Sequence, residues 1–277
     1  MISCIICSRN VDLSTELKEN IASTIGCDFE LIVIDNSKNK YSIFSAYNEG
    51  VRRAKGELLC FMHEDIIYQS SSWGLIVQEK FKCDDKVGLV GVLGTHFIPK
   101  CICNIGDSGV LSSYYITDKK QLSNKSEYFC EGYAEVVAVD GMWFCVRKDL
   151  FNSTIRFDET FNGFHLYDMD ICLQIRLYGY KCYVVNKILI EHYSAGGIDS
   201  MFLKNSIHFY EKWKEYLPQL AGVELSHKEK ELSASLAEMN AYARELKYYL
   251  DKRNNFWFFR LKRKIRCIVN SRKLKLC

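Results

Sequence analysis

Short apolar runs alternate with amphipathic segments in the first third of the chain. Three runs have the length and composition of strands buried on both faces: residues 2–7, 29–35 and 57–62. Between them, residues 13–25 and 44–54 repeat apolar side chains at helical spacing. Asp12 or Ser14 is placed to cap the first of these helices, and Gly56 to end the second. This order predicts an α/β fold with a mostly parallel, doubly wound sheet.

The alternation continues less regularly after residue 70. It predicts helices over 73–81, 168–179, 201–217 and 224–250, and strands over 87–93, 142–146 and 181–190. Residues 94–135 have no clear period and are rich in Gly, Asn, Ser and Tyr. We therefore expect them to form an irregular surface segment over the edge of the sheet.

Polar residues follow each of the first three strands: Ser8-Arg9-Asn10, Asp35-Asn36 and His63-Glu64-Asp65. Ligands bind at the carboxyl edge of such sheets, where these residues should meet. No G-x-G-x-x-G follows the first strand, so the phosphates of a bound nucleotide would lack a backbone cradle. A hard cation held by a carboxylate would take that role, which points to Asp65 as a metal ligand. A polar turn without a ligand explains this stretch alone equally well.

Composition favours a globular protein of one large domain, or one domain with an appendage. The chain has 277 residues, 48% of them hydrophobic, and 13 scattered cysteines, an odd number typical of buried thiols in a reducing compartment. Cys101 and Cys103, with Cys83 and Cys130, form an irregularly spaced alternative zinc set. No secretory signal and no apolar run long enough to span a membrane is visible, so we expect a cytoplasmic protein.

Charge is concentrated at the C-terminus. Residues 251–277 carry ten basic residues and one acid, a net +9, which leaves −6 on the rest of a chain of net +3. The aromatic residues 256–259 lie beside these charges, and this mixture favours an anionic membrane surface over nucleic acid. Residues 224–250 either pack on the domain or pair between chains as a homo-oligomer.

Four stretches together resemble nucleotide-sugar glycosyltransferases of the GT-A fold, of the bacterial family 2-like type. They are ISCIICSRN, ELIVIDNS, YNEGVRRAKGELLCFMHED and FNGFHLYDMDICLQIRLYGYK, and in order and spacing they cover about residues 1–195. Two positions depart from the family pattern. The D-x-D motif reads His63-Glu64-Asp65, and the E-D-x-D motif reads Tyr167-Asp168-Met169-Asp170. The imidazole favours Mn²⁺ over Mg²⁺.

The resemblance implies a Rossmann-like GT-A domain followed by a C-terminal helical extension. The domain would cover residues 1–197, with a nucleotide-binding half over 1–93 and an acceptor and catalytic half over 94–197. Residues 198–250 would form the helical extension and 251–277 a basic-aromatic tail. The activity would be inverting, metal-dependent transfer from a nucleoside-diphosphate sugar, a UDP-sugar, to a hydroxyl of a glycan or lipid-linked acceptor in bacterial surface-polysaccharide synthesis.

The resemblance also assigns roles. Asp168 would be the general base, and Asp170 a supporting acid that holds the acceptor or a neighbouring Arg. The remaining sets are His63, Asp65 and His192 for the metal, Ser8, Arg9, Asp35, Asn36 and Glu64 for the nucleotide, and Asp140 and Gly141 for donor sugar or acceptor. Structural roles explain some of these residues as well, since acids favour the first turn of a helix and Asp35 can form a turn.

Two other functions fit parts of the sequence. A catalytically silent scaffold that binds nucleotide sugar or protein partners is favoured by the histidine at position 63. A sugar-phosphate nucleotidyltransferase would need a glycine-rich loop after the first strand, and this chain has Ser8-Arg9-Asn10-Val11 there.

Overall fold

The structure is a computed structural model. It describes residues 1–107, 111–112, 114–118, 121–123, 132–151, 154–193 and 199–273, and the side chains within 1–107, 132–151, 154–193 and 199–253.

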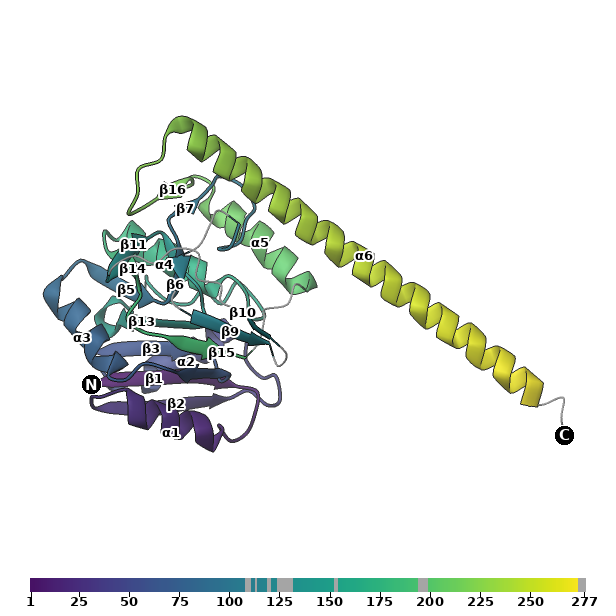
Figure 1. Ribbon diagram of the computed structural model, residues 1–277, viewed down its shortest axis with the longest axis horizontal. Coiled ribbons are helices and arrows are strands. Elements are labelled where there is room, and N and C mark those ends of the chain that lie inside the picture. Colours follow the sequence, from purple (N-terminus) through teal and green to yellow (C-terminus); the bar gives the residue numbers. More distant parts are fainter. Residues whose placement is uncertain are drawn as a thin grey trace.

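Seven strands form the central sheet, in the order β11-β14-β5-β13-β3-β1-β2 (Figure 1). They are β1 (Ile2–Ser8), β2 (Phe29–Asp35), β3 (Leu58–Met62), β5 (Val87–Gly91), β11 (Tyr133–Val136), β13 (Trp143–Arg147) and β14 (Lys181–Val185). β1 is parallel to β2 and β3, and β14 to β5, whereas β13 is antiparallel to β3 and β5, and β11 to β14. β1, β2, β3, β5 and β14 thus point one way, which confirms the mostly parallel sheet.

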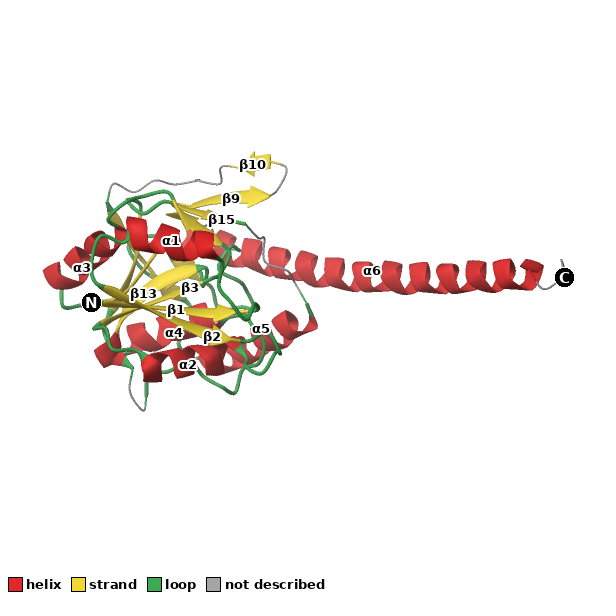
Figure 2. Cartoon of the chain, turned by 90° about the horizontal axis from the view of Figure 1, so that it is seen from below, coloured by secondary structure: helices red, strands yellow, loops and turns green. Residues whose placement is uncertain are grey.

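Helices cover both faces of this sheet (Figure 2). α1 (Thr15–Thr24) and α3 (Trp73–Cys83) lie on one face, and α2 (Ile43–Arg53) and α4 (Tyr167–Leu177) on the other. Side chains alternate between the faces of a strand. Cys4 and Ile6 accordingly belong to the core under α1 and α3, and Ile5 to the core under α2 and α4.

Local features of the chain mark the helix ends. Ser14 caps α1, its hydroxyl accepting the N–H of Leu17 at 3.2 Å. α2 ends at Arg53, just before the Gly56 that the sequence suggested as its stop. α4 begins directly after Leu166, whose left-handed backbone conformation, with a φ of 67°, separates the helix from the preceding turn.

Within the described residues, shorter strands build three small sheets, in the orders β10-β9-β15-β4, β12-β6-β8 and β16-β7. They are β4 (Ile66–Tyr68), β6 (Leu93–Thr95), β7 (Phe97–Ile98), β8 (Leu111–Ser112), β9 (Tyr114–Asp118), β10 (Gln121–Ser123), β12 (Ala138–Val139), β15 (Ile190–His192) and β16 (Gln219–Leu220); a 3₁₀ turn spans Lys148–Leu150. β15 is antiparallel to β4, with His192 opposite Ile66. This register brings His192 beside the end of β3.

Two predictions of secondary structure are wrong, those for residues 94–135 and 181–190. The described part of 94–135 is not an irregular surface segment, because it contributes several strands and its Cys101, Cys103 and Ile105 are buried. These short strands pair with segments distant in sequence, such as β6 with β12, which local periodicity does not reveal. The expected strand over 181–190 is two strands, because the chain turns at Asn186 and enters a second sheet.

The C-terminal helices have different surroundings. α5 (Ser200–Trp213) packs Phe209 and Trp213 into the core shared with α2 and α4. α6 (His227–Lys273) begins along the body, where Arg244 forms a two-atom ion pair with the buried Asp107, and then projects away from it (Figure 1). α6 thus continues from the segment predicted as a helical extension, 198–250, into the segment predicted as a tail, 251–277. The proposed boundary at 197/198 lies outside the described residues. Among the described residues, no helix is both long and apolar enough to span a membrane.

Candidate active site

Two imidazoles and a carboxylate meet at the carboxyl edge of the sheet. Nδ1 of His63 lies 3.4 Å from Nε2 of His192, and Oδ1 of Asp65 lies 3.9 Å from the first nitrogen and 3.4 Å from the second. One ligand atom from each residue can be chosen so that all lie within 4.8 Å of one another. Histidine and carboxylate together suit Mn²⁺, so the donor set fits the cation expected from the sequence. The structure therefore brings the three predicted metal ligands together.

The fold explains why these three side chains lie together. His63 and Asp65 directly follow the buried strand β3, and the backbone N–H of His63 donates to the carbonyl of Met142 at 3.0 Å. The pairing of β15 with β4 is extended by the N–H of Tyr193, which donates to the carbonyl of Asp65 at 3.0 Å. Burial, and then the neighbouring His192, lowers the pKa of His63 below its usual range. The His63 imidazole is therefore neutral near pH 7 and can offer a lone pair.

Tyr167 lies on the other side of His63. Its hydroxyl is 3.0 Å from Nε2 of His63 and donates to the carbonyl of Gly141 at 3.0 Å. The sequence alone gives no role for this tyrosine, although Tyr167 replaces the glutamate of the family motif. That departure was the signal that could have found it.

Asp168, the predicted base, opens α4 beside Gly141. Its carboxylate accepts the N–H of Gly141 at 2.8 Å and the N–H of Met169 at 2.9 Å. Burial, and then the negative charge of Asp140, raises its pKa to about 7. Asp140 itself accepts the N–H of Met142 at 2.9 Å. A carboxyl that exchanges its proton near neutral pH is well matched to general base catalysis.

Glu64 ties the end of β1 to the end of β3. Its carboxylate accepts the Ser8 hydroxyl at 2.5 Å, the Arg9 N–H at 3.0 Å and the Asn10 side-chain amide at 3.2 Å. The Arg9 guanidinium lies 5.7 Å from the centre of the Phe164 ring. Three of the predicted nucleotide-binding residues are thus in contact with one another.

Asp35 and Asn36 follow β2 and shape the next loop. Hydrogen bonds from Ser37 lower the pKa of the exposed Asp35 carboxyl, which accepts the Ser37 N–H at 2.9 Å. The Asn36 side chain is buried and pairs with the backbone N–H and carbonyl of Tyr41, at 2.8 and 2.9 Å. Asn36 thus has a clear structural role, and its contact with a nucleotide stays a prediction.

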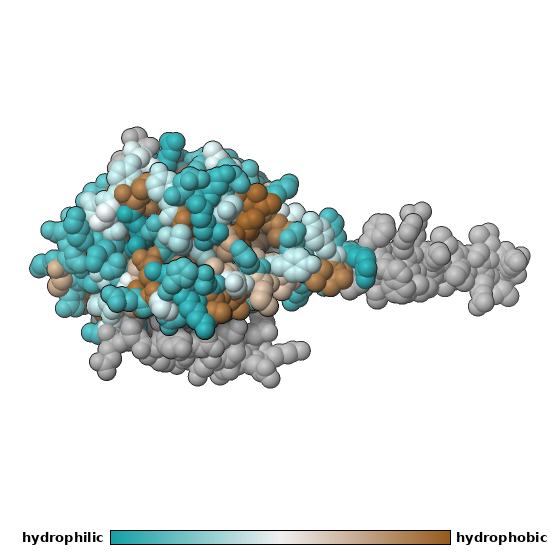
Figure 3. All heavy atoms as spheres, turned by 90° about the horizontal axis from the view of Figure 1, so that it is seen from above, coloured by the Kyte–Doolittle hydropathy of each residue, from teal (hydrophilic) through white to brown (hydrophobic). Residues whose placement is uncertain are grey.

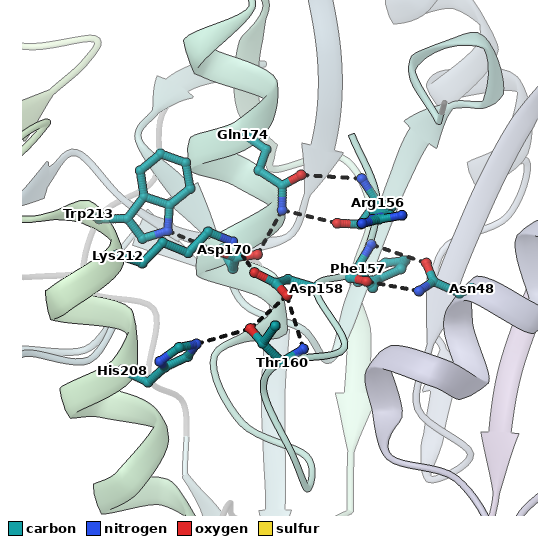
Figure 4. A network of polar contacts seen from close by, with 10 residues as sticks. All are labelled: Asn48, Arg156, Phe157, Asp158, Thr160, Asp170, Gln174, His208, Lys212 and Trp213. Carbon is teal, nitrogen blue, oxygen red and sulfur yellow. Dashed lines mark hydrogen bonds and ion pairs between the residues drawn. The ribbon is translucent and has the colours of Figure 1, made fainter. Parts of the chain in front are cut away.

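Asp170 lies in a buried network of polar contacts (Figure 4). Its carboxylate accepts the Trp213 indole N–H at 2.8 Å and the Gln174 amide at 2.7 Å, and pairs with the Lys212 ammonium at 2.7 Å. Lys212 also reaches Asp158 at 2.7 Å. Only 1% of Asp170 is exposed. Its cation is Lys212 of α5 rather than the expected arginine, so the pair joins α4 to α5, and a contact with the acceptor stays a prediction. Sequence reasoning missed Lys212 and Trp213, which lie far away along the chain.

The alternative zinc set is only partly described. Cys101 and Cys103 are buried and Cys83 is exposed, whereas Cys130 lies outside the described residues. Among the described side chains, the cluster suited to a metal is the triad of His63, Asp65 and His192.

Known structures share this fold. GalNAc-T7, whose crystal structure contains UDP, GalNAc and Mn²⁺, is 14% identical with a TM-score of 0.53; the match covers 89% of this chain and 57% of that chain. Residues 1–349 of S. aureus TarS are 14% identical with a TM-score of 0.51, covering 85% of this chain and 69% of that one. This chain thus spans little more than half the length of GalNAc-T7.

The fold is thus the GT-A fold that these two structures share. The chain belongs to the glycosyltransferase-like family, whose model matches residues 1–208. Among curated proteins, the "ATP synthase subunits region ORF 6" protein of Fuscovulum blasticum is 24% identical over 195 residues, 68% of this chain and 73% of that protein.

Proposed function

We propose that the chain is an inverting, metal-dependent glycosyltransferase that uses a nucleoside-diphosphate sugar. The observation that carries this proposal is the triad of His63, Asp65 and His192, next to a carboxyl whose pKa is raised to about 7. A divalent cation held there would neutralise the negative charge that develops on the leaving diphosphate.

Asp168 accepts the proton of the acceptor hydroxyl in this mechanism. The hydroxyl oxygen forms a bond to the anomeric carbon while the bond from that carbon to the diphosphate oxygen breaks, and the configuration inverts. The Gly141 and Met169 N–H groups hold the Asp168 carboxylate by two hydrogen bonds and fix its direction. Asp140, which faces the same region, contacts the donor sugar or the acceptor.

The nucleotide lies along the ends of β1 and β2. Ser8, Arg9 and Glu64 shape one side of this region, and the exposed Asp35 is available to a base or ribose. Uridine is the proposed base and Mn²⁺ the proposed cation, since a protein of the same fold was crystallised with UDP, GalNAc and Mn²⁺.

The acceptor is a glycan or lipid-linked hydroxyl in surface-polysaccharide synthesis. The basic and aromatic composition of residues 251–277 supports a peripheral position on the cytoplasmic face of the membrane. A catalytically silent scaffold is the alternative, and turnover of any nucleotide sugar would exclude it.

We also propose that α6 pairs with a second copy of this chain. An exposed seam follows the four-three spacing of a coiled coil: Leu232, Leu236, Met239, Ala243, Leu246 and Leu250. Another face of the helix turns toward the body through the buried Ala237 and the half-buried Arg244, which pairs with Asp107. Apolar surface is visible along the described part of the helix (Figure 3). Light scattering should report a dimer that Leu246→Glu dissociates; a monomeric wild type would exclude the pairing.

Thermal-shift measurements with nucleoside diphosphates, each with and without Mn²⁺, test the proposed function. A ligand that binds the folded state raises the melting temperature, so one base should stabilise the protein in a Mn²⁺-dependent way. No stabilisation by any nucleoside diphosphate would contradict the proposal.

A further inference from the structure

The hydroxyl of Tyr167 lies between two polar groups, the Gly141 carbonyl and Nε2 of His63. A backbone carbonyl can only accept, so the Tyr167 hydroxyl proton is committed to Gly141, at 3.0 Å. The oxygen of Tyr167 can then only accept from Nε2 of His63, also at 3.0 Å. A neutral imidazole with its proton on Nε2 has its lone pair on Nδ1, the nitrogen that faces His192 and Asp65.

The position of Tyr167 is fixed by its surroundings. The residue is buried, and its ring meets those of Phe44 and Tyr47 edge-on, with centroids 6.1 and 5.5 Å away. Gly141 makes room for the phenol, since a Cβ at that position would lie 2.2 Å from the Tyr167 oxygen. Burial also raises the pKa of Tyr167 well above its usual range, so the hydroxyl keeps its proton.

The two positions that depart from the sequence motifs are therefore in direct contact. A carboxylate at position 63 would carry lone pairs on both oxygens, whereas a neutral histidine has a lone pair on only one ring nitrogen, so its tautomer matters. The tyrosine at position 167 lies within hydrogen-bonding distance of the other ring nitrogen, Nε2.

We propose that Tyr167 is a positioning residue that holds His63 with its proton on Nε2 and its Nδ1 lone pair directed at a divalent cation shared with Asp65 and His192. This inference rests on the proposed function, in which these three residues bind the cation. Partners of this kind fix the orientation of ligating histidines, and their loss typically costs about 10- to 100-fold in metal affinity.

The first experiment requires no cation. Protein labelled with ¹⁵N-histidine is kept in EDTA at pH 8, and its ring nitrogens are observed by long-range ¹H–¹⁵N correlation, with His63 assigned from a His63→Gln variant. Wild type should show His63 with its proton on Nε2. Tyr167→Phe, which removes only the hydroxyl, should show a mixture of tautomers. A His63 protonated on Nδ1 in wild type would overturn the proposal, even if the variant failed to fold.

The second experiment measures Mn²⁺ affinity by titration calorimetry without donor or acceptor. Tyr167→Phe should weaken binding at least about tenfold. Tyr133→Phe is the matched control, since it also loses a hydroxyl bond to a carbonyl, that of Ile76 at 3.2 Å, and should bind as wild type does. Unchanged affinity and tautomer in Tyr167→Phe would refute the role of Tyr167. Wild type that binds no Mn²⁺ would instead refute the proposed metal site, and with it the cation-directing part of this inference.

Discussion

Oδ1 of Asp170 lies 2.7 Å from Nζ of Lys212, and this ion pair joins α4, which carries Asp168, to α5. Removing one partner of a buried pair leaves the other charge without compensation. Lys212 keeps 27% of its side chain exposed, so Lys212→Met should lower the free energy of unfolding by about 2 to 3 kcal/mol, less than a fully buried pair would lose. Urea denaturation measures this change.

Lys214 provides the matched control, because it directly follows α5 and pairs with Glu211 of that helix at the surface. Lys214→Met should leave the urea midpoint nearly unchanged, since exposed pairs contribute little. Equal midpoints for the two variants would show that the buried network does not hold α5 in place.

Asp65→Ala should abolish the Mn²⁺-dependent part of nucleoside-diphosphate binding, because it removes the only carboxylate of the described triad. Titration calorimetry with and without EDTA measures this. Asp85→Ala, at an exposed side chain near the start of β5, is the control and should bind as wild type does. The metal assignment is wrong if EDTA leaves binding to wild type unaltered.

Asp168→Asn keeps the size of the side chain but removes its basicity. Transfer should fall by roughly 10² to 10⁴, the usual contribution of a general base, while donor affinity persists. Single-turnover rates and donor titrations separate these two effects. A variant that retains most of the wild-type transfer rate would exclude Asp168 as the base.

The raised pKa of Asp168 also makes stability depend on pH. The folded protein holds this proton up to about pH 7, whereas the unfolded chain releases it near pH 4. Stability from this group is therefore complete below about pH 4 and is lost as pH rises through about 7. In EDTA, the melting temperature of Asp168→Asn should gain on wild type between about pH 4 and 7 and keep that lead above. A pH-independent difference would contradict the raised pKa.

Residues 251–277 should confer binding to anionic vesicles. Each basic residue near such a surface contributes about 1 kcal/mol, an attraction that salt screens. Co-sedimentation with and without phosphatidylglycerol should show salt-sensitive pelleting of the full chain and little pelleting of a chain ending at Leu250. Equal pelleting of both would exclude this segment as the anchor, and equal affinity for DNA would indicate a general polycation.

The sequence was most informative where local patterns determine structure. β1, β2 and β3 were predicted because each is an apolar run followed by polar residues, and the carboxyl edge of the sheet follows from their order. The triad could be proposed because His63 and Asp65 follow one strand and the family resemblance supplied His192.

Partners distant in sequence could not be predicted in this way. The pairing of Asp170 with Lys212 depends on how α5 packs on α4, which the periodicity of either helix does not contain. The bond between Tyr167 and His63 likewise joins residues more than 100 positions apart. The split of the last strand into β14 and β15 depends on a second sheet that accepts β15.

The continuity of α6 gives the molecule a built-in spacer. Its 47 residues, at about 1.5 Å each, measure about 70 Å from end to end. The length of the helix therefore determines how far a surface or partner bound at its far end lies from His63 and Asp168. Inserting or deleting whole turns would change how far an acceptor must extend to be reached, without altering a single group in the site.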